Sequence, residues 1–300
     1  MKQILNTVFA VLCSTALVAS AGIVAPDPAK LKLKSANVLI VGAGDGSPIY
    51  SKNAESVTPI ASITKLMTAM VVLDAHQPVD ELLVIDVADL DLIKGSHSRL
   101  RMGVELPRKE MLRLALMSSE NRAASALCRY YAGGTDACVR AMNAKAVKLG
   151  MTRSHFNDPT GLSSDNMSTA HDLVKMVRAA SQYPVIREFS TTPAAIIDAS
   201  PSGGSLAFRN TNALVRGGTW DIQLQKTGFI REAGRCLVMM ANVASKPVVI
   251  VLLDSIGQMT RIGDANRIRY WLETGESMPA PVVRAAHHHK KVVAKRRHRA

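Results

Sequence analysis

The chain has 300 residues, of which 47% are hydrophobic and 20% charged. These proportions exclude a disordered protein and leave room for one large domain or two closely packed subdomains. The formal net charge is +13, but seven cations lie between Arg284 and the C-terminus, so the rest of the chain carries about +6.

The N-terminus has the three parts of a secretory signal peptide. The short cationic lead Met1–Gln3 precedes the mostly apolar segment Ile4–Leu17 and the small-residue site Ala19–Ala21. We expect residues 1–21 to be cleaved off and the protein to be exported to the periplasm. An uncleaved anchor is the alternative, although the apolar segment is short for a membrane-spanning helix.

Strand-like and helix-like segments follow in a simple order. Two strands at 36–42 and 47–50, joined by a glycine-containing turn, precede a helix from Ile63 to about Asp74. Four helices are expected next, at 107–117, from the polar break 118–121 to about 130, at 135–149 and at 169–182, the last ending before Pro184. Four strands and a helix follow, at 206–210, 222–228, 236–243, 247–253 and 261–274.

Strands at both ends and helices in the middle predict an α/β (α+β) fold. The economical arrangement is one antiparallel sheet built from both termini, with flanking helices and a helical insert. We expect a single domain at 22–278, with a sheet subdomain at about 30–57 and 203–275 and a helical subdomain at about 58–202. A basic tail, 279–300, follows.

Ser62 and Lys65 lie three residues apart at the start of the first predicted helix, on one face. A serine hydroxyl is a weak nucleophile until a base takes its proton. A lysine amine can be that base if burial and nearby cations keep it neutral. An isolated S-x-x-K is most often a helix cap followed by a solvated lysine, so this pattern needs support from the rest of the chain.

Two further motifs supply that support. Ser119–Asn121 (S-x-N) lies in the break between two predicted helices, and Lys226–Gly228 (K-T-G) lies on a strand. S-x-x-K and K-T-G each occur once, whereas Ser51–Asn53 also fits S-x-N but precedes the first motif at a strand end. The three motifs in this order and on these elements form a strong signal.

With these motifs the sequence resembles the penicillin-recognising serine enzymes, which include the low-molecular-weight D,D-peptidases and the class A β-lactamases. Four segments, 59–69, 116–124, 158–163 and 226–236, are similar to the D-alanyl-D-alanine peptidase family. Within it the sequence most resembles the endopeptidases of the penicillin-binding protein 7 type, because Glu120 lies inside S-x-N and the chain ends soon after the catalytic domain.

The resemblance and the chemistry together imply the catalytic roles. Ser62 is the nucleophile that carries an acyl ester, Lys65 is its base, and Ser119 relays a proton to the departing amine. The backbone N–H groups of Ser62 and Phe229 form the oxyanion hole. We also expect like-charge repulsion from Lys226 to lower the pKa of Lys65.

The same resemblance implies the substrate-binding residues. Asn121 bonds the amide of the substrate, Lys226 supplies positive potential, and Thr227 donates to a substrate carboxylate. Gly228 lets the strand approach the substrate without a Cβ clash. The sequence indicates no cofactor and no metal site, since neither C-x-x-C nor H-E-x-x-H occurs.

The implied function is a serine D,D-endopeptidase that cleaves peptidoglycan cross-links and is inhibited by β-lactam antibiotics. A D-alanyl-D-alanine carboxypeptidase is the alternative, because both reactions pass through the same acyl-enzyme. A class A β-lactamase is less favoured, since 157–169 contains no deacylating glutamate. A non-catalytic cell-wall binder is also less favoured. So is a Ser-His-Asp hydrolase that would use His155 or His171, because the sequence contains no G-x-S-x-G elbow with either histidine.

Cysteines and the C-terminal tail carry the remaining predictions. An oxidising compartment permits a disulfide between Cys128 and Cys138, which flank a glycine pair, and Cys236 is expected to be a buried thiol. The basic tail is expected to be disordered and to associate weakly with an anionic membrane or wall. Nucleic acid is not an expected partner of an exported protein.

Overall fold

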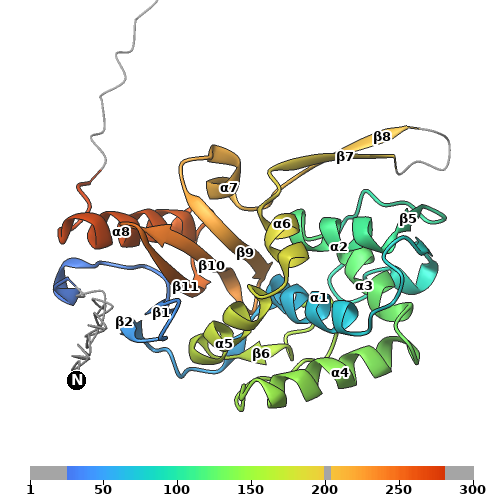
Figure 1. Ribbon diagram of the computed structural model, residues 1–300, viewed down its shortest axis with the longest axis horizontal. Helices are drawn as coiled ribbons and strands as arrows, with labels where there is room; N and C mark the ends of the chain where they lie inside the picture. The colour runs from blue at the N-terminus through green and yellow to red at the C-terminus, as the bar shows by residue number, and fades with distance from the viewer. Residues whose placement is uncertain (1–25, 199–203, 281–300) are drawn as a thin grey trace, which may run out of the picture.

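The structure is a computed structural model that describes residues 26–198 and 204–280 (Figure 1). The predicted signal peptide, 1–21, and all of the predicted tail beyond Ala280 lie outside these residues. None of the helices in the described ranges has the length and apolar character needed to cross a membrane.

A five-stranded antiparallel sheet forms one side of the molecule (Figure 1). Strand β1 (Asn37–Gly42) pairs on one side with β2 (Pro48–Lys52) and on the other with β11 (Lys246–Ser255). Strands β10 (Gly234–Val243) and β9 (Asp221–Ile230) complete the order β2-β1-β11-β10-β9. The sheet is therefore built from both ends of the chain, which confirms the predicted α/β architecture.

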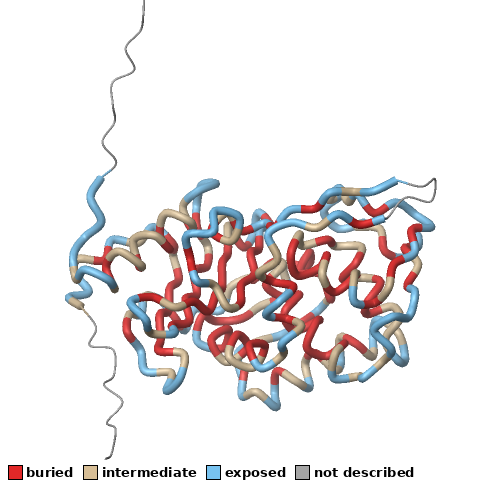
Figure 2. Tube along the Cα trace, turned by 45° about the horizontal axis from the view of Figure 1, so that its top comes forward, coloured by how far each residue is buried: buried red, intermediate tan, exposed pale blue. Residues whose placement is uncertain are grey.

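Both faces of the central strands are buried, so side chains of alternate residues enter two separate hydrophobic clusters. In β1, Val38 and Ile40 face helix α8 (Thr260–Thr274), whose Ile268 and Trp271 belong to the same cluster. Leu39 and Val41 belong to the other cluster, which continues into the helical part of the molecule. Figure 2 shows this buried interior passing without a break from the sheet into the helices.

The helical part surrounds one buried helix, α1 (Lys65–Asp74), which has buried residues from Lys65 to Val72. Around it lie α2 (Arg108–Met117), α3 (Asn121–Arg129), α4 (Gly134–Lys148) and α5 (Ala170–Ala180). A helix buried on all sides is hydrophobic all round. Among the buried residues of α1, Lys65 is the one with an ionisable side chain. This makes Lys65 the first candidate for a functional role.

One prediction about the chain between 183 and 210 was wrong, and one helix in it was not predicted. Segment 206–210 was placed in the main sheet, but β8 (Ser205–Arg209) pairs with β7 (Ala194–Asp198) as a separate hairpin that extends over the helical part (Figure 1). The predicted helix 169–182 does end before Pro184, as α5 (Ala170–Ala180) shows, but Pro184 then begins helix α6 (Pro184–Thr191), because proline at the first helical position loses no hydrogen bond.

Short elements connect these parts. They are η1 (Pro28–Lys30), β3 (Thr58–Pro59), η2 (Ala61–Thr64), β4 (Leu82–Val84), η3 (Val87–Asp89), β5 (Glu105–Pro107), β6 (Met167–Ser168) and α7 (Ala213–Gly217). Cys128 of α3 and Cys138 of α4 form a disulfide, with a Cα–Cα distance of 5.4 Å. Cys236 is a buried free thiol in β10, and burial raises its pKa to about 11.

Candidate active site

Ser62 and Lys65 meet where the short helix η2 continues into α1. The predicted helix begins as a 3₁₀ turn at Ala61, whose φ of 48° is positive, and Lys65 follows as the first residue of α1. Lys65 Nζ lies 2.9 Å from Ser62 Oγ. It also donates to the carbonyl oxygen of Thr160 at 2.6 Å. This geometry lets the amine take a proton directly from the serine hydroxyl.

The environment of Lys65 favours a neutral amine. Burial lowers its pKa from 10.5 to about 7, while the carboxylates of Asp158, Glu120 and Asp91 oppose the shift. The expectation that repulsion from Lys226 lowers this pKa was therefore wrong in its cause, because the cost of burying a charge dominates. A pKa near 7 leaves a large fraction of Lys65 deprotonated at neutral pH.

A second serine–lysine pair comes from two other elements. Ser119 lies in the break between α2 and α3 and has a φ of 63°, in the left-handed region that non-glycine residues seldom occupy. Lys226 of β9 donates to Ser119 Oγ at 2.9 Å and to the carbonyl oxygen of Thr227 at the same distance. Burial lowers the pKa of Lys226 well below 10.5, and Lys65 and Arg261 lower it further.

Asn121 connects the first serine–lysine pair to a neighbouring loop. Its Oδ1 accepts from Lys65 Nζ at 2.7 Å, and its Nδ2 donates to Ser96 Oγ at 2.8 Å. An amide nitrogen carries two hydrogens, so Nδ2 can bond Ser96 and a ligand oxygen at once. Asn121 is thus part of the lysine environment, and one hydrogen of its Nδ2 is left over after the bond to Ser96.

Two glycines allow backbone to pass beside the nucleophile. A Cβ on Gly228 would lie 2.9 Å from the carbonyl oxygen of Ile60 and 3.2 Å from the nitrogen of Ser62. A Cβ on Gly161, which has a φ of 82°, would lie 2.0 Å from the carbonyl oxygen of Ala61. The loop around Gly161 and strand β9 therefore hold the peptide of Ser62 from two sides.

Two residues of the site had no individual signal in the sequence. The Thr211 hydroxyl lies 2.6 Å from that of Thr227. The Arg261 guanidinium, at the start of α8, donates to the carbonyl oxygen of Gly228 at 3.3 Å, and its buried Nε has no hydrogen-bond partner among the described residues. Gly161 and Thr160, by contrast, lie in a segment that the family resemblance already included.

These groups line one cleft of about 630 Å³. Ser62, Ser119, Asn121, Thr227, Gly228 and Phe229 all face it, so the structure brings the three motifs together, with Lys65 and Lys226 buried behind the two serines. The Phe229 side chain is 52% exposed at the edge of the cleft.

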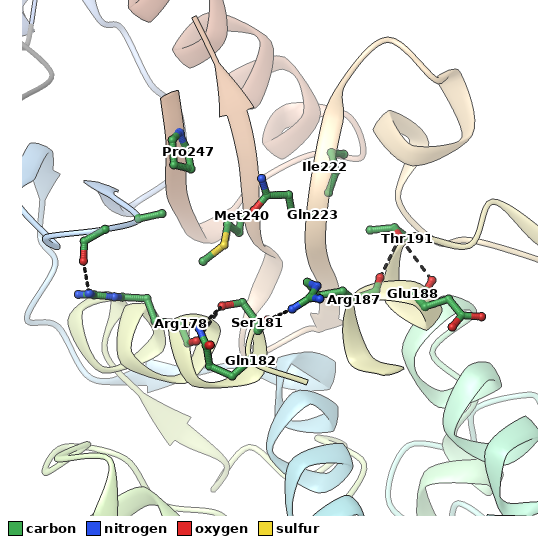
Figure 3. A pocket seen from close by; sticks show the side chains of 12 residues that line it. Arg178, Ser181, Gln182, Arg187, Glu188, Thr191, Ile222, Gln223, Met240 and Pro247 are labelled. Atoms are coloured by element: carbon green, nitrogen blue, oxygen red, sulfur yellow. Dashed lines mark hydrogen bonds between the residues drawn. The ribbon is translucent and has the colours of Figure 1, made fainter. Parts of the chain in front are cut away.

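A larger hollow of about 720 Å³ lies between α5, α6 and the strands β9–β11 (Figure 3). Its two hydroxyl side chains, Ser181 and Thr191, donate to backbone carbonyls of their own helices rather than to a base. The larger cavity in this molecule is therefore not the one that contains a serine bonded to a base.

A serine bonded to a buried lysine with a lowered pKa, with a second serine–lysine pair beside it, defines a serine peptidase of the penicillin-recognising class. Residues 24–257 match the family model described as D-alanyl-D-alanine carboxypeptidase, and the chain belongs to that family. The predicted enzyme class and family are confirmed.

Individual relatives agree with this assignment. The chain is 48% identical over 260 residues to the D-alanyl-D-alanine endopeptidase of Pseudomonas aeruginosa, covering 87% of this chain and 84% of the relative. It is 50% identical over 250 residues to that of Escherichia coli, covering 83% and 81%. The crystal structure of the Streptomyces K15 DD-transpeptidase superimposes with a TM-score of 0.74 at 28% identity, covering 81% of this chain and 98% of that one.

Proposed function

We propose that the chain is a serine D,D-endopeptidase that hydrolyses D-alanyl–diamino acid cross-links in peptidoglycan. The observation that carries this proposal is Lys65 Nζ, buried, 2.9 Å from Ser62 Oγ, with a pKa of about 7. The relatives at 48% and 50% identity, both described as D-alanyl-D-alanine endopeptidases, support the choice of the cross-link as substrate.

Acylation follows from the site geometry. Ser62 Oγ attacks the carbonyl carbon of the D-alanine in the cross-link while Lys65 accepts the hydroxyl proton. The negative oxygen of the tetrahedral intermediate is stabilised by the N–H groups of Ser62 and Phe229. The C–N bond then breaks, the leaving nitrogen receives a proton through Ser119, and an ester on Ser62 remains.

Hydrolysis repeats these steps with water. Lys65 takes a proton from a water molecule while the water oxygen attacks the ester carbonyl carbon. The Ser62 oxygen regains a proton when the ester bond breaks. In this step Lys65 is again the base, so both halves of the reaction require the neutral amine.

The cationic end of the cleft fits the carboxylate of the leaving group. Thr227 can donate a hydroxyl hydrogen bond, and Arg261 offers a buried Nε without a hydrogen-bond partner among the described residues. Burial lowers the pKa of Arg261, and repulsion from the neighbouring Arg235 lowers it further. Positive charges therefore crowd one another at this end of the cleft. An arriving carboxylate would relieve that crowding.

We propose that β-lactams acylate Ser62 and leave slowly. Loop 157–169 supplies Asp158 in place of a glutamate, and its carboxylate accepts backbone N–H bonds from Thr160 at 2.6 Å, Gly161 at 2.8 Å and Ser163 at 2.9 Å. A carboxylate held in this way supports the loop and is poorly placed to activate a deacylating water. Rapid, sustained turnover of nitrocefin by the pure protein would contradict this.

Export and wall association are proposals as well. We propose that residues 1–21 direct export to the periplasm, that 22–278 form the catalytic domain, and that the basic tail attracts anionic membrane or wall. Truncation after Met278 should then reduce sedimentation with cell envelopes at low salt. Unchanged sedimentation would count against a role for the tail.

The function is tested by incubating the purified protein with a cross-linked muropeptide dimer and, separately, with a pentapeptide monomer. An endopeptidase converts the dimer to monomers and leaves most pentapeptide intact, and the Ser62→Ala variant does neither. Release of D-alanine from the pentapeptide with the dimer intact would instead establish the carboxypeptidase alternative, which the description of the matched family favours.

A further inference from the structure

An ion pair lies among the residues that line the catalytic cleft. Lys94 Nζ lies 2.5 Å from Glu232 Oε1, and both residues line the cleft that contains Ser62. Lys94 belongs to the loop between η3 and β5, whereas Glu232 lies in the turn between β9 and β10. The pair therefore spans the cleft from its helical wall to its sheet wall.

Both partners are held in place by the surrounding backbone. The Asp91 carboxylate accepts the N–H groups of Lys94 at 2.8 Å and Ser96 at 2.7 Å, which fixes the loop. Ser96 in turn accepts from Asn121 of the S-x-N motif at 2.8 Å. Glu232 lies two residues after the end of the strand that carries K-T-G. The position of the ion pair is thus coupled to two of the three catalytic motifs.

The direction of β9 shows which part of the substrate lies near this pair. Under the proposed function, Thr227 receives the carboxylate of the leaving group and the N–H of Phe229 receives the oxygen of the scissile carbonyl. The donor peptide, which becomes the acyl group, then extends beyond Phe229 toward Glu232. Glu232 is the third residue after Phe229, which is at most about 10 Å of extended strand.

The donor peptide of a D,D cross-link carries a charged group at a matching distance. Its D-alanine is joined to the L-centre of a diamino acid, whose side chain ends in a D-centre with an ammonium and a carboxylate. About eight bonds separate that D-centre from the scissile carbonyl carbon, or about 10 Å when extended. The alkyl chain between them would pass Ile93 and Phe229, which line the cleft and are 58% and 52% exposed.

We propose that Lys94 and Glu232 form a subsite for the free ammonium–carboxylate end of the donor diamino acid, Glu232 binding the ammonium and Lys94 the carboxylate. This inference rests on the proposed endopeptidase function. The side chains are 31% and 42% exposed, and a pair this accessible adds little stability, so it opens at low cost. A zwitterion can replace each partner by a charge of the same sign, which leaves both side chains paired.

The test compares two cross-linked dimers that differ only at the donor D-centre, whose amine is free in one and acetylated in the other. We expect the protein to prefer the free amine by about tenfold in kcat/KM. In Glu232→Gln the preference should fall to about one. The matched control is Glu276→Gln, which breaks an exposed ion pair outside the cleft, Lys30 to Glu276 at 2.7 Å, and should keep the tenfold preference.

Two results would overturn the inference: equal kcat/KM for the two dimers, or an unchanged preference in Glu232→Gln. An unchanged preference with an equal loss on both dimers would mean that Glu232 only supports its turn. If neither dimer is cleaved, the endopeptidase proposal fails, and the subsite is tested separately. Tetrapeptide monomers with free or acetylated D-centres then compete with a fluorescent penicillin for Ser62, and equal potency of the two monomers would overturn the inference.

Discussion

Two serine–lysine pairs face the same cleft, and their Nζ–Oγ distances are both 2.9 Å. The charges around them differ. Near Lys65 lie three carboxylates, which oppose the lowering of its pKa by burial and leave it at about 7. Near Lys226 lie two basic side chains, Lys65 and Arg261, whose positive charge adds to the effect of burial. The same two residue types are therefore placed in opposite electrostatic surroundings.

This difference indicates a division of labour. A lysine that titrates near pH 7 can accept and return a proton during each turnover, so Lys65 suits the base. A lysine among cations is destabilised in its charged form until an anion arrives, so Lys226 suits the end that receives a carboxylate. The predictions below test this division, beginning with the largest expected effect.

Replacing Lys65 by arginine should remove the base, while the side chain stays long and becomes permanently positive. A guanidinium does not deprotonate near neutral pH, so we expect acylation of Ser62 to fall by about 10³- to 10⁴-fold. The measurement is the second-order rate of labelling by a fluorescent penicillin. The same substitution at Lys226, Lys226→Arg, keeps the positive charge and should cost clearly less. Equal losses in the two variants would break the distinction between the pairs.

Removing the second hydroxyl, in Ser119→Ala, should slow cleavage of the muropeptide dimer by about 10²- to 10³-fold, because the leaving amine loses its proton donor. Product formation is followed by separating the muropeptides. The matched control is the Ser181→Ala variant, because Ser181 lies in the hollow between α5 and α6. This variant should cleave the dimer at the normal rate. A fully active Ser119→Ala enzyme would exclude the proton-relay role.

The backbone behind the first pair is tested with Gly161→Ala. The new Cβ would collide with the carbonyl oxygen of Ala61 at 2.0 Å, so Ser62 must move, and a shift of about 1 Å can cost about 100-fold in rate. The control is Gly150→Ala, which also has a positive φ, 70°, but meets no atom within 4 Å of the Cβ. We expect Gly150→Ala to cost about 1–2 kcal/mol of stability and little activity.

Thr211→Val should have the smallest effect. The variant loses the 2.6 Å hydroxyl contact that orients Thr227 but keeps the shape of the side chain. Because Thr227 is proposed to bind the substrate carboxylate, we expect KM to rise about three- to tenfold with kcat nearly unchanged. A fall in kcat at constant KM would instead place Thr211 in the chemical step.

The sequence was sufficient to predict the parts of this site that repeat a pattern. Apolar runs predicted strands β1, β9, β10 and β11, and three short motifs predicted which elements must meet. Arg261 escaped prediction because it is a single residue, distant in the chain from Gly228, that only the packing of α8 against the sheet brings to the cleft. Helix α6 was missed because a proline both ends and begins helices.

Burial and nearby cations were both expected to keep Lys65 neutral, but the sequence did not show which of them dominates. Spacing alone placed two lysines in one site and suggested mutual repulsion. The structure shows that complete burial of Lys65 dominates and that carboxylates from three separate segments, Asp91, Glu120 and Asp158, oppose it. How deeply a side chain is buried depends on the whole fold, so no local pattern contains it.

The most direct test of the central claim is the pH dependence of Ser62 acylation by a fluorescent penicillin. The base must be neutral, and Lys65 is protonated below its pKa of about 7. We therefore expect the rate to rise about tenfold per pH unit between about pH 5 and 7 and to level off above about pH 8. A rate independent of pH over this range, or one that keeps rising toward pH 10, would contradict the assignment of Lys65 as the base.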